Sequence, residues 1–487
     1  MRRLGRPAAT ALVAAVATAG GVLGVVMLYR RSCEKRSICG SAASTTARTP
    51  AAVAEPPPTP AAPTPSLARP TTATAAATAT AATAAADARD NDDALELSPE
   101  QLATFERDGV LVVPGVLTPE EVAEARRGLH GELRSYGVDP ENLDETAHHL
   151  RPLSSTNGSG GVLNVYYPPF KLLLNEHPKL WSVVTQLWER TYAKRDPPHP
   201  HFEHGYGPFD PNRGYIYMDR VGFRVPDAVA EAHARVDPNA KKKRKRPLPL
   251  QRSLTPHLDC CPSSIYSPDG SQGGKRVVKW RPIQCLVALT DTLEADHGGF
   301  EAARGFHREF DEWASTRPPQ ANGGDAPCVG EFTPIRPKED ARVLARIEHV
   351  PCTAGSLVLW DWRTPHANAR YNRGACAREV AYLGYLPDVP LNRAYAAAQL
   401  RAYQQGMDPD DQWHHDRTAR PERGATATAG VNSRSQAVRI NEAERTRAEP
   451  EADTEGSGPG GGRGRHAATA RHTFSSLGRS LMGIGEW

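Results

Sequence analysis

The sequence lacks several features that would assign it to a familiar class of protein. None of its eight cysteines forms a Cys-x-x-Cys pair, which argues against a structural zinc site. Eight cysteines in 487 residues are also too few for a disulfide scaffold. The net charge of +3 is too balanced to indicate a nucleic-acid partner, and no internal repeat is evident. These absences leave an ordinary globular core as the expectation.

Long apolar runs are scarce as well, and the clearest one lies at residues 8–29. It contains no charged residue and has basic residues on both sides. About 20 such residues can span a bilayer as a helix, so we predict a single-pass membrane protein anchored by residues 1–39. A mitochondrial or plastid transit peptide is the alternative, because the first 33 residues contain no acid and are rich in arginine and alanine.

Composition divides the remaining chain into three parts. Residues 40–92 consist almost entirely of alanine, threonine and proline, which predicts a disordered stalk. Residues 408–487 are rich in arginine and glycine, which predicts a disordered tail. The folded domain is therefore expected at residues 93–407. Within it, the basic run Lys241–Arg246 is flanked by prolines and is interpreted as a solvated insertion loop.

The expected folded domain begins with helices and continues with short strands. Two capping boxes, Ser98-Pro-Glu-Gln101 and Thr118-Pro-Glu-Glu121, predict helix starts, and a further helix is predicted from Pro178 to Tyr192. Short runs rich in strand-forming residues follow at 214–218, 277–280, 283–289, 343–350, 356–360 and 380–386. This order predicts an α+β fold that is mainly β, with helices packed on a sandwich or barrel.

Two histidines and an aspartate carry the strongest chemical signal. His257 and Asp259 lie two residues apart in Thr-Pro-His-Leu-Asp, so on a strand both side chains point to one face. His366 follows the apolar run 356–360 and a Thr-Pro break, which again indicates a strand end. Two histidines and one carboxylate form a facial triad that holds Fe(II) and leaves its other face open. Arg378, twelve residues beyond His366, offers a guanidinium that suits the distal carboxylate of a dicarboxylate co-substrate.

Three further segments are similar to the phytanoyl-CoA dioxygenase-like family of Fe(II)/2-oxoglutarate oxygenases, and the resemblance covers most of residues 98–390. The segments are Phe105-Glu-Arg-Asp-Gly109-Val-Leu-Val-Val-Pro, Gly298-Gly-Phe-Glu-Ala-Ala-Arg-Gly305-Phe-His307, and Gly355-Ser-Leu-Val-Leu-Trp-Asp361 followed by Pro365-His366-Ala-Asn368.

The resemblance implies a double-stranded β-helix core of the jelly-roll or cupin-like type. It further implies that iron is bound by His257, Asp259 and His366, that Arg378 holds the distal carboxylate of 2-oxoglutarate, and that Gln284 lines the co-substrate pocket. The spacing from His366 to Arg378 is one residue longer than the family pattern, so two other arginines remain alternatives for this anchor. They are Arg370 and Arg373.

The implied activity is hydroxylation of a C–H bond in a small or lipidic organic substrate, with 2-oxoglutarate and O2 consumed. One alternative is a membrane-anchored hydroxylase of proteins, and another is an inactive tethered binding domain of the same fold. Asp259 is an intact carboxylate, which argues against a halogenase. No specific protein partner is indicated.

A second histidine cluster, His199-Pro-His201-Phe-Glu203-His204, has metal-like spacing but no strand pattern, and is interpreted as a loop or substrate-side lining.

Overall fold

The computed structural model describes residues 94–193, 199–236, 247–262, 277–316, 332–409 and 472–487. The predictions for the stalk 40–92 and for Lys241–Arg246 concern residues outside these ranges. The predicted single-pass membrane location is corrected, because no helix in the described ranges has the length and apolar character needed to cross a bilayer. Residues 8–29, on which that prediction rested, themselves lie outside the described residues.

The larger sheet has seven antiparallel strands within the described residues. In order of pairing they are β1 (Val110–Val113), β10 (Leu357–Asp361), β6 (Ile283–Ala288), β12 (Arg378–Pro387), β4 (Val221–Arg224) and β2 (Val162–Leu163), with β3 (Gly214–Ile216) also paired with β12. Every residue of β6 is buried, as expected for a central strand covered on both faces.

The smaller sheet faces the larger one and carries the histidines singled out above. Its strands, in order of pairing, are β8 (Thr333–Pro334), β5 (Leu254–Leu258), β11 (His366–Asn368), β7 (Phe300–Ala303) and β9 (Ile347–His349). Along the chain, β4, β6, β10 and β12 belong to the larger sheet, while the intervening β5, β7, β9 and β11 belong to the smaller one. Two antiparallel sheets interleaved in this way form a double-stranded β-helix, which confirms the predicted fold class.

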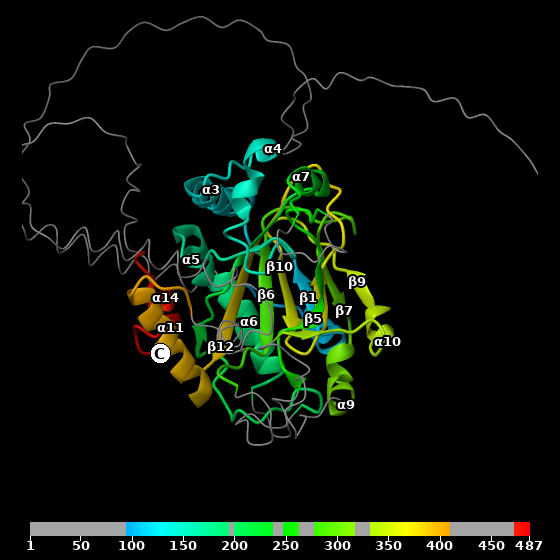
Figure 1. The fold of residues 1–487 in the computed structure, drawn as a ribbon. Coiled ribbons are helices and arrows are strands. Elements are labelled where there is room, and N and C mark those ends of the chain that lie inside the picture. Colours follow the sequence, from blue (N-terminus) through cyan, green and yellow to red (C-terminus); the bar gives the residue numbers. More distant parts are fainter. Residues whose placement is uncertain (1–93, 194–198, 237–246, 263–276, 317–331, 410–471) are drawn as a thin grey trace, which may run out of the picture. The chain divides into compact units, whose positions relative to one another are not determined.

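Helices flank the strands on several sides (Figure 1). They are α2 (Pro99–Asp108), α3 (Pro119–Ser135), α4 (Leu143–Thr146), α5 (Pro169–Asn175), α6 (Pro178–Arg190), α7 (Asp227–Ala232), α9 (Phe310–Ser315), α10 (Ala341–Leu344), α11 (Pro390–Gln404) and α14 (Ser476–Leu481). Both predicted capping boxes are present: Ser98 and Thr118 accept hydrogen bonds from the third helical residue, whose side chain accepts one in return.

Side chains alternate between the two faces of the long strand β12, which separates the helical layer from the interior. Val380 points inward and belongs to the cluster between the sheets. Glu379 points outward, where its carboxylate accepts hydrogen bonds from Arg126 at 3.0 and 3.1 Å and lies 2.9 Å from His130 Nε2. Because Arg126 and His130 both lie on α3, this contact fixes α3 against the sheet.

Two predicted strands differ from the observed structure. The run 277–280 forms no strand, although Trp280 is buried and its backbone N–H donates to Asn392 Oδ1. The run 343–350 begins inside helix α10 and only its end forms β9. Apolar periodicity over so few residues does not separate a strand from a short buried helix or an extended loop.

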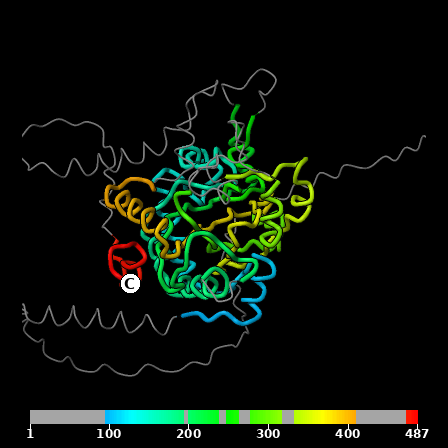
Figure 2. The backbone as a smooth tube through the Cα atoms, turned by 90° about the horizontal axis from the view of Figure 1, so that it is seen from below, coloured from blue at the N-terminus to red at the C-terminus, as the bar shows by residue number. Residues whose placement is uncertain are grey.

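Residues 472–487, the last part of the tail predicted to be disordered at 408–487, are folded, whereas residues 410–471 lie outside the described ranges. Residues 472–487 contain α14 and lie beside α11 in both views (Figures 1 and 2). The buried carboxylate of Glu176 accepts hydrogen bonds from the backbone N–H of Ser475 at 2.8 Å and from its hydroxyl at 2.7 Å. The ring of Trp487 stacks on that of Trp181, with centroids 5.5 Å apart. The domain limits themselves remain predictions.

Candidate metal centre

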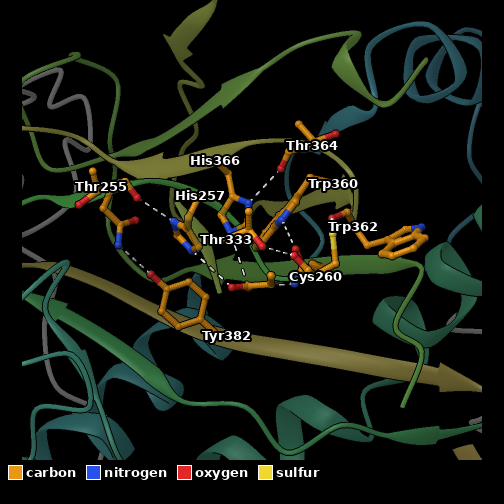
Figure 3. Close-up of polar contacts among 12 residues, drawn as sticks. Thr255, His257, Cys260, Thr333, Trp360, Trp362, Thr364, His366 and Tyr382 are labelled. Carbon is orange, nitrogen blue, oxygen red and sulfur yellow. Dashed lines mark hydrogen bonds and ion pairs between the residues drawn. The ribbon is translucent and has the colours of Figure 1, made fainter. Parts of the chain in front are cut away.

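The predicted triad residues come from two neighbouring strands of the smaller sheet. His257 lies on β5 and Asp259 directly follows that strand, while His366 opens β11. His257 and His366 are register partners across the antiparallel pair, so both imidazoles project to the same face. Figure 3 shows the two rings facing the same point, and their centroids are 4.4 Å apart. The predicted residues are therefore brought together.

The donor atoms of these three residues are close enough to share one ion. His257 Nε2 lies 3.4 Å from Asp259 Oδ1, and His366 Nε2 lies 3.7 Å from Asp259 Oδ2. All three ligand atoms lie within 4.8 Å of one another. Metal–nitrogen and metal–oxygen bonds of about 2.0–2.2 Å place neighbouring ligand atoms roughly 3 Å apart, so only small adjustments are required. Among the described residues this is the one such group.

Backbone carbonyls fix which nitrogen of each imidazole faces the ion. His257 Nδ1 lies 2.8 Å from the carbonyl oxygen of Thr255, and His366 Nδ1 lies 3.0 Å from that of Thr364. A carbonyl can only accept, so each Nδ1 carries the hydrogen and each Nε2 presents its lone pair. Both histidines occur in the tripeptide Thr-Pro-His. This shared tripeptide is a signal that sequence reasoning could have used.

Electrostatics keep the donors in the protonation states that a metal requires. Burial raises the pKa of Asp259, but its interactions with His257 and His366 outweigh burial and hold that pKa well below 3.8. Burial, together with the charge of His257, lowers the pKa of His366 below its ordinary value of 6.5. At neutral pH the site therefore presents a carboxylate and a neutral His366 imidazole.

Gln284 contacts the metal centre through Asp259. Its Nε2 donates to Asp259 Oδ2 at 3.0 Å, and its Oε1 accepts a hydrogen bond from Trp360 Nε1 at 2.5 Å. Sequence reasoning missed Arg281, whose Nη2 lies 3.6 Å from the same Asp259 oxygen and whose Nη1 pairs with Asp219 at 2.7 Å. Both side chains restrict the orientation of Asp259, which is how polar neighbours of a metal ligand act.

Of the three arginines considered as co-substrate anchors, Arg378 alone is buried. Its side chain lies on the inner face of the larger sheet, and Nη1 donates to Asn368 Oδ1 at 3.1 Å and to the hydroxyl of Tyr382 at 3.3 Å. Arg370 is exposed, and the side chain of Arg373 is 62% exposed beside Asp296. Burial and position thus favour Arg378 over the alternatives.

In the second histidine cluster, His204 contacts Tyr192 and Trp280. His204 Nε2 lies 2.8 Å from the carbonyl oxygen of Tyr192, and the His204 ring stacks on Trp280 at 4.2 Å. Burial lowers the pKa of His204. His201 is exposed. This agrees with the interpretation of the cluster as a loop.

Comparison with known proteins gives fold-level similarity only. No protein-family model matches the chain, and no curated protein matches it. Similar solved structures include the hypothetical protein JW0805 from Escherichia coli, with 15% identity over 70% of this chain and 82% of that one and a TM-score of 0.45. GIG2 (DUF1479) from Candida albicans shows 14% identity over 74% and 84%, with a TM-score of 0.44.

A third similar structure is EctD from S. alaskensis, determined with 2-oxoglutarate and 5-hydroxyectoine. It shows 17% identity over 60% of this chain and 76% of that one, with a TM-score of 0.35. Likenesses this distant carry no information about activity. Membership of the phytanoyl-CoA dioxygenase-like family is not shown by these comparisons.

Proposed function

We propose that this chain is a non-haem Fe(II)- and 2-oxoglutarate-dependent dioxygenase that hydroxylates a C–H bond of a small organic substrate. The observation that carries the proposal is the group formed by His257, Asp259 and His366. Three donors with two imidazole nitrogens and one carboxylate lie within 4.8 Å of one another, inside a double-stranded β-helix. This donor set suits Fe(II) with open coordination positions.

The residues around the triad fit a co-substrate that reaches from the metal to Arg378. Asn368 lies two residues beyond His366 on β11, so it shares the inner face with that ligand. Asn368 in turn contacts Arg378 and Tyr382. A dicarboxylate bound at the triad would therefore extend along Asn368 and Tyr382 to the buried guanidinium.

Aromatic side chains cover the His366 side of the site, while the side chain of Asp259 is 33% exposed. Phe300 and Trp360 pack against the ring of His366, with centroids 5.8 and 5.1 Å away, and both are almost fully buried. Once bound, iron and 2-oxoglutarate supply the oxidising chemistry, in which O2 gives one oxygen atom to succinate and one to the product while CO2 is released. The protein contributes the ligand geometry and the carboxylate anchor.

The test is formation of succinate from 2-oxoglutarate by the purified full-length chain. We expect succinate to form with Fe(II) and O2 present, and to fall to background when iron is removed or when Asp259 is replaced in Asp259→Ala. His201→Ala, in the exposed histidine cluster, is the matched control and should retain activity. Folded protein that forms no succinate under any of these conditions would favour the non-catalytic binding domain instead.

A further inference from the structure

Two buried arginines lie opposite each other on neighbouring strands of the larger sheet. Arg224 ends β4 and is the register partner of Arg378, which opens β12. Directly opposed residues of an antiparallel pair project to the same face, with Cβ atoms about 4.5–5.5 Å apart. Gly222 lies two residues before Arg224 on β4, so the two residues share one face of the strand. A Cβ at Gly222 would lie 3.1 Å from the ring of Tyr382, which identifies this face as the one that Tyr382 also occupies. Arg224 therefore projects inward, beside Arg378 and Tyr382.

The guanidinium of Arg224 has more donors than partners. Its Nη2 donates to Asp227 Oδ1 at 3.0 Å and contacts the carbonyl oxygen of Arg370 at 3.5 Å. Its Nε and Nη1 are buried and have no hydrogen-bond partner, although the residue is only 1% exposed. These two nitrogens carry three N–H groups. Leaving charged donors buried and unpaired is costly, and such atoms call for an explanation.

Two glycines allow close packing of the strands and loops near Arg224. A Cβ at Gly298, whose φ is +73°, would lie 3.4 Å from Arg224 Cγ and 3.2 Å from Asn372 Cβ. A Cβ at Gly222 would lie 2.6 Å from Val380 Cγ2. Gly298 thus lets the backbone pass close to the aliphatic part of the Arg224 side chain, and Gly222 lets β4 pack closely against Val380 and Tyr382 of β12.

The buried side chains around Arg224 and Arg378 carry more positive than negative charge. Arg224 and Arg378 are two cations; Asp227 pairs with Arg224, whereas the hydrogen bonds of Arg378 go to the neutral side chains of Asn368 and Tyr382. Glu379, the neighbour of Arg378, points to the opposite face and pairs with Arg126. Burial and the nearby charge of Arg378 both lower the pKa of Arg224, as expected where positive charge is in excess. A bound anion would restore neutrality.

We propose that Arg224 and Arg378 together form one anion site that binds the distal carboxylate of the dicarboxylate co-substrate. Arg378 supplies a guanidinium that Asn368 and Tyr382 hold in place through its Nη1, and Arg224 supplies its unpaired Nε and Nη1. The inference rests on the proposed function and adds a second specificity residue to it. A site with two arginines selects strongly for a 2-oxo acid that carries a second carboxylate over one that does not.

The experiment is an anaerobic titration of the Fe(II)-loaded full-length chain with two 2-oxo acids, followed by the visible absorption of the chelate. We expect Arg224→Gln to weaken binding of 2-oxoglutarate by about 10- to 100-fold, because charge-assisted hydrogen bonds are lost. Binding of 2-oxobutyrate, which has no distal carboxylate, should be unchanged. Arg378→Gln should show the same selectivity, which marks the two residues as one site.

Arg224→Lys provides the second variant if Arg224→Gln does not fold. It keeps the charge but loses the guanidinium geometry, so an intermediate loss confined to 2-oxoglutarate is expected. Wild-type affinity for 2-oxoglutarate in the folded Arg224 variants, alongside a loss in Arg378→Gln, would overturn this inference and leave the proposed function standing. A wild-type chain that gives no absorption with either acid would instead contradict the proposed function.

Discussion

His366 lies directly across from His257 on adjacent antiparallel strands, and each ring is held by the carbonyl two residues before it. This relationship orients both Nε2 atoms toward Asp259 before any metal binds. Because the imidazoles are fixed by backbone atoms, neither has to be ordered when an ion arrives. The centre is thereby organised in advance by local chain geometry.

Gln284 should influence metal affinity without itself being a ligand. In Gln284→Ala the Asp259 carboxylate loses the hydrogen bond at its Oδ2 atom. We expect Fe(II) or Mn(II) to bind about 10- to 100-fold more weakly, with little change in unfolding temperature. Trp360→Phe, which removes the donor to Gln284 and keeps the aromatic packing, should have a smaller effect in the same direction. Equal metal affinity in wild type and Gln284→Ala would show that Asp259 is oriented by other contacts.

Metal affinity should decline on the acidic side of pH 6.5. The pKa of His366 is lowered from 6.5 and that of Asp259 lies well below 3.8, so protons compete with the metal only as the pH falls below His366's ordinary value. Above that pH the affinity should be nearly constant. Titration of Mn(II) binding between pH 5 and pH 8 checks this. An affinity that already falls between pH 8 and pH 7 would contradict the depressed pKa of His366.

Glu379 should contribute to stability in a pH-dependent way. Its contacts with His130 and Arg126 outweigh burial, so its pKa lies below 4.5 in the folded protein. Because this pKa is lower in the folded than in the unfolded protein, the contribution of Glu379 to folding stability is fully present above pH 4.5. That contribution is lost as the pH falls through the pKa of Glu379 in the folded protein.

Glu379→Gln should therefore lower the free energy of unfolding by about 1–3 kcal/mol at pH 7. The difference from wild type should shrink below pH 4.5. Arg107→Gln is the control, because the side chain of Arg107 is 61% exposed in its pair with Asp108 and should contribute little. Denaturant unfolding at pH 7 and pH 4 measures both effects, and a difference that grows on acidification would refute this assignment.

The C-terminal segment should stabilise the domain. Removal of residues 472–487 uncovers Trp181 and deletes Leu481 and Met482, which are 0% and 2% exposed. We expect the free energy of unfolding to fall by about 2–5 kcal/mol, after allowance for the entropy of ordering the segment. Leu481→Ala should account for much of the loss, whereas Ile484→Ala, at a position that is 39% exposed, should not. Identical unfolding curves for the full-length and truncated chains would show that the contact is not stabilising.

The sequence predicted those parts of the site that depend on local periodicity. His257 and Asp259 were placed on one face because side chains alternate along a strand, and the Thr-Pro break before His366 indicated a strand end. The helix starts at Ser98 and Thr118 were predicted because a capping box is complete within four residues. Each of these patterns lies within a few consecutive residues.

The remaining features depend on contacts between distant parts of the chain. Arg224 and Arg378 are 154 positions apart in sequence and become partners only through strand pairing. Gln284 meets Asp259 and Trp360 through tertiary packing, which no local spacing records. The end of the chain escaped prediction because α14 has six residues, too few for a helical period to be recognised.

We propose that His257 and Arg378 serve one centre that binds Fe(II) and 2-oxoglutarate together. The most direct test of this proposal is an anaerobic titration of the full-length chain with both, followed by the visible charge-transfer absorption. We predict absorption in the wild type, its loss in His257→Ala, and a requirement for much more 2-oxoglutarate in Arg378→Gln. Folded wild-type protein that develops no absorption, or equal absorption in all three proteins, would contradict the account.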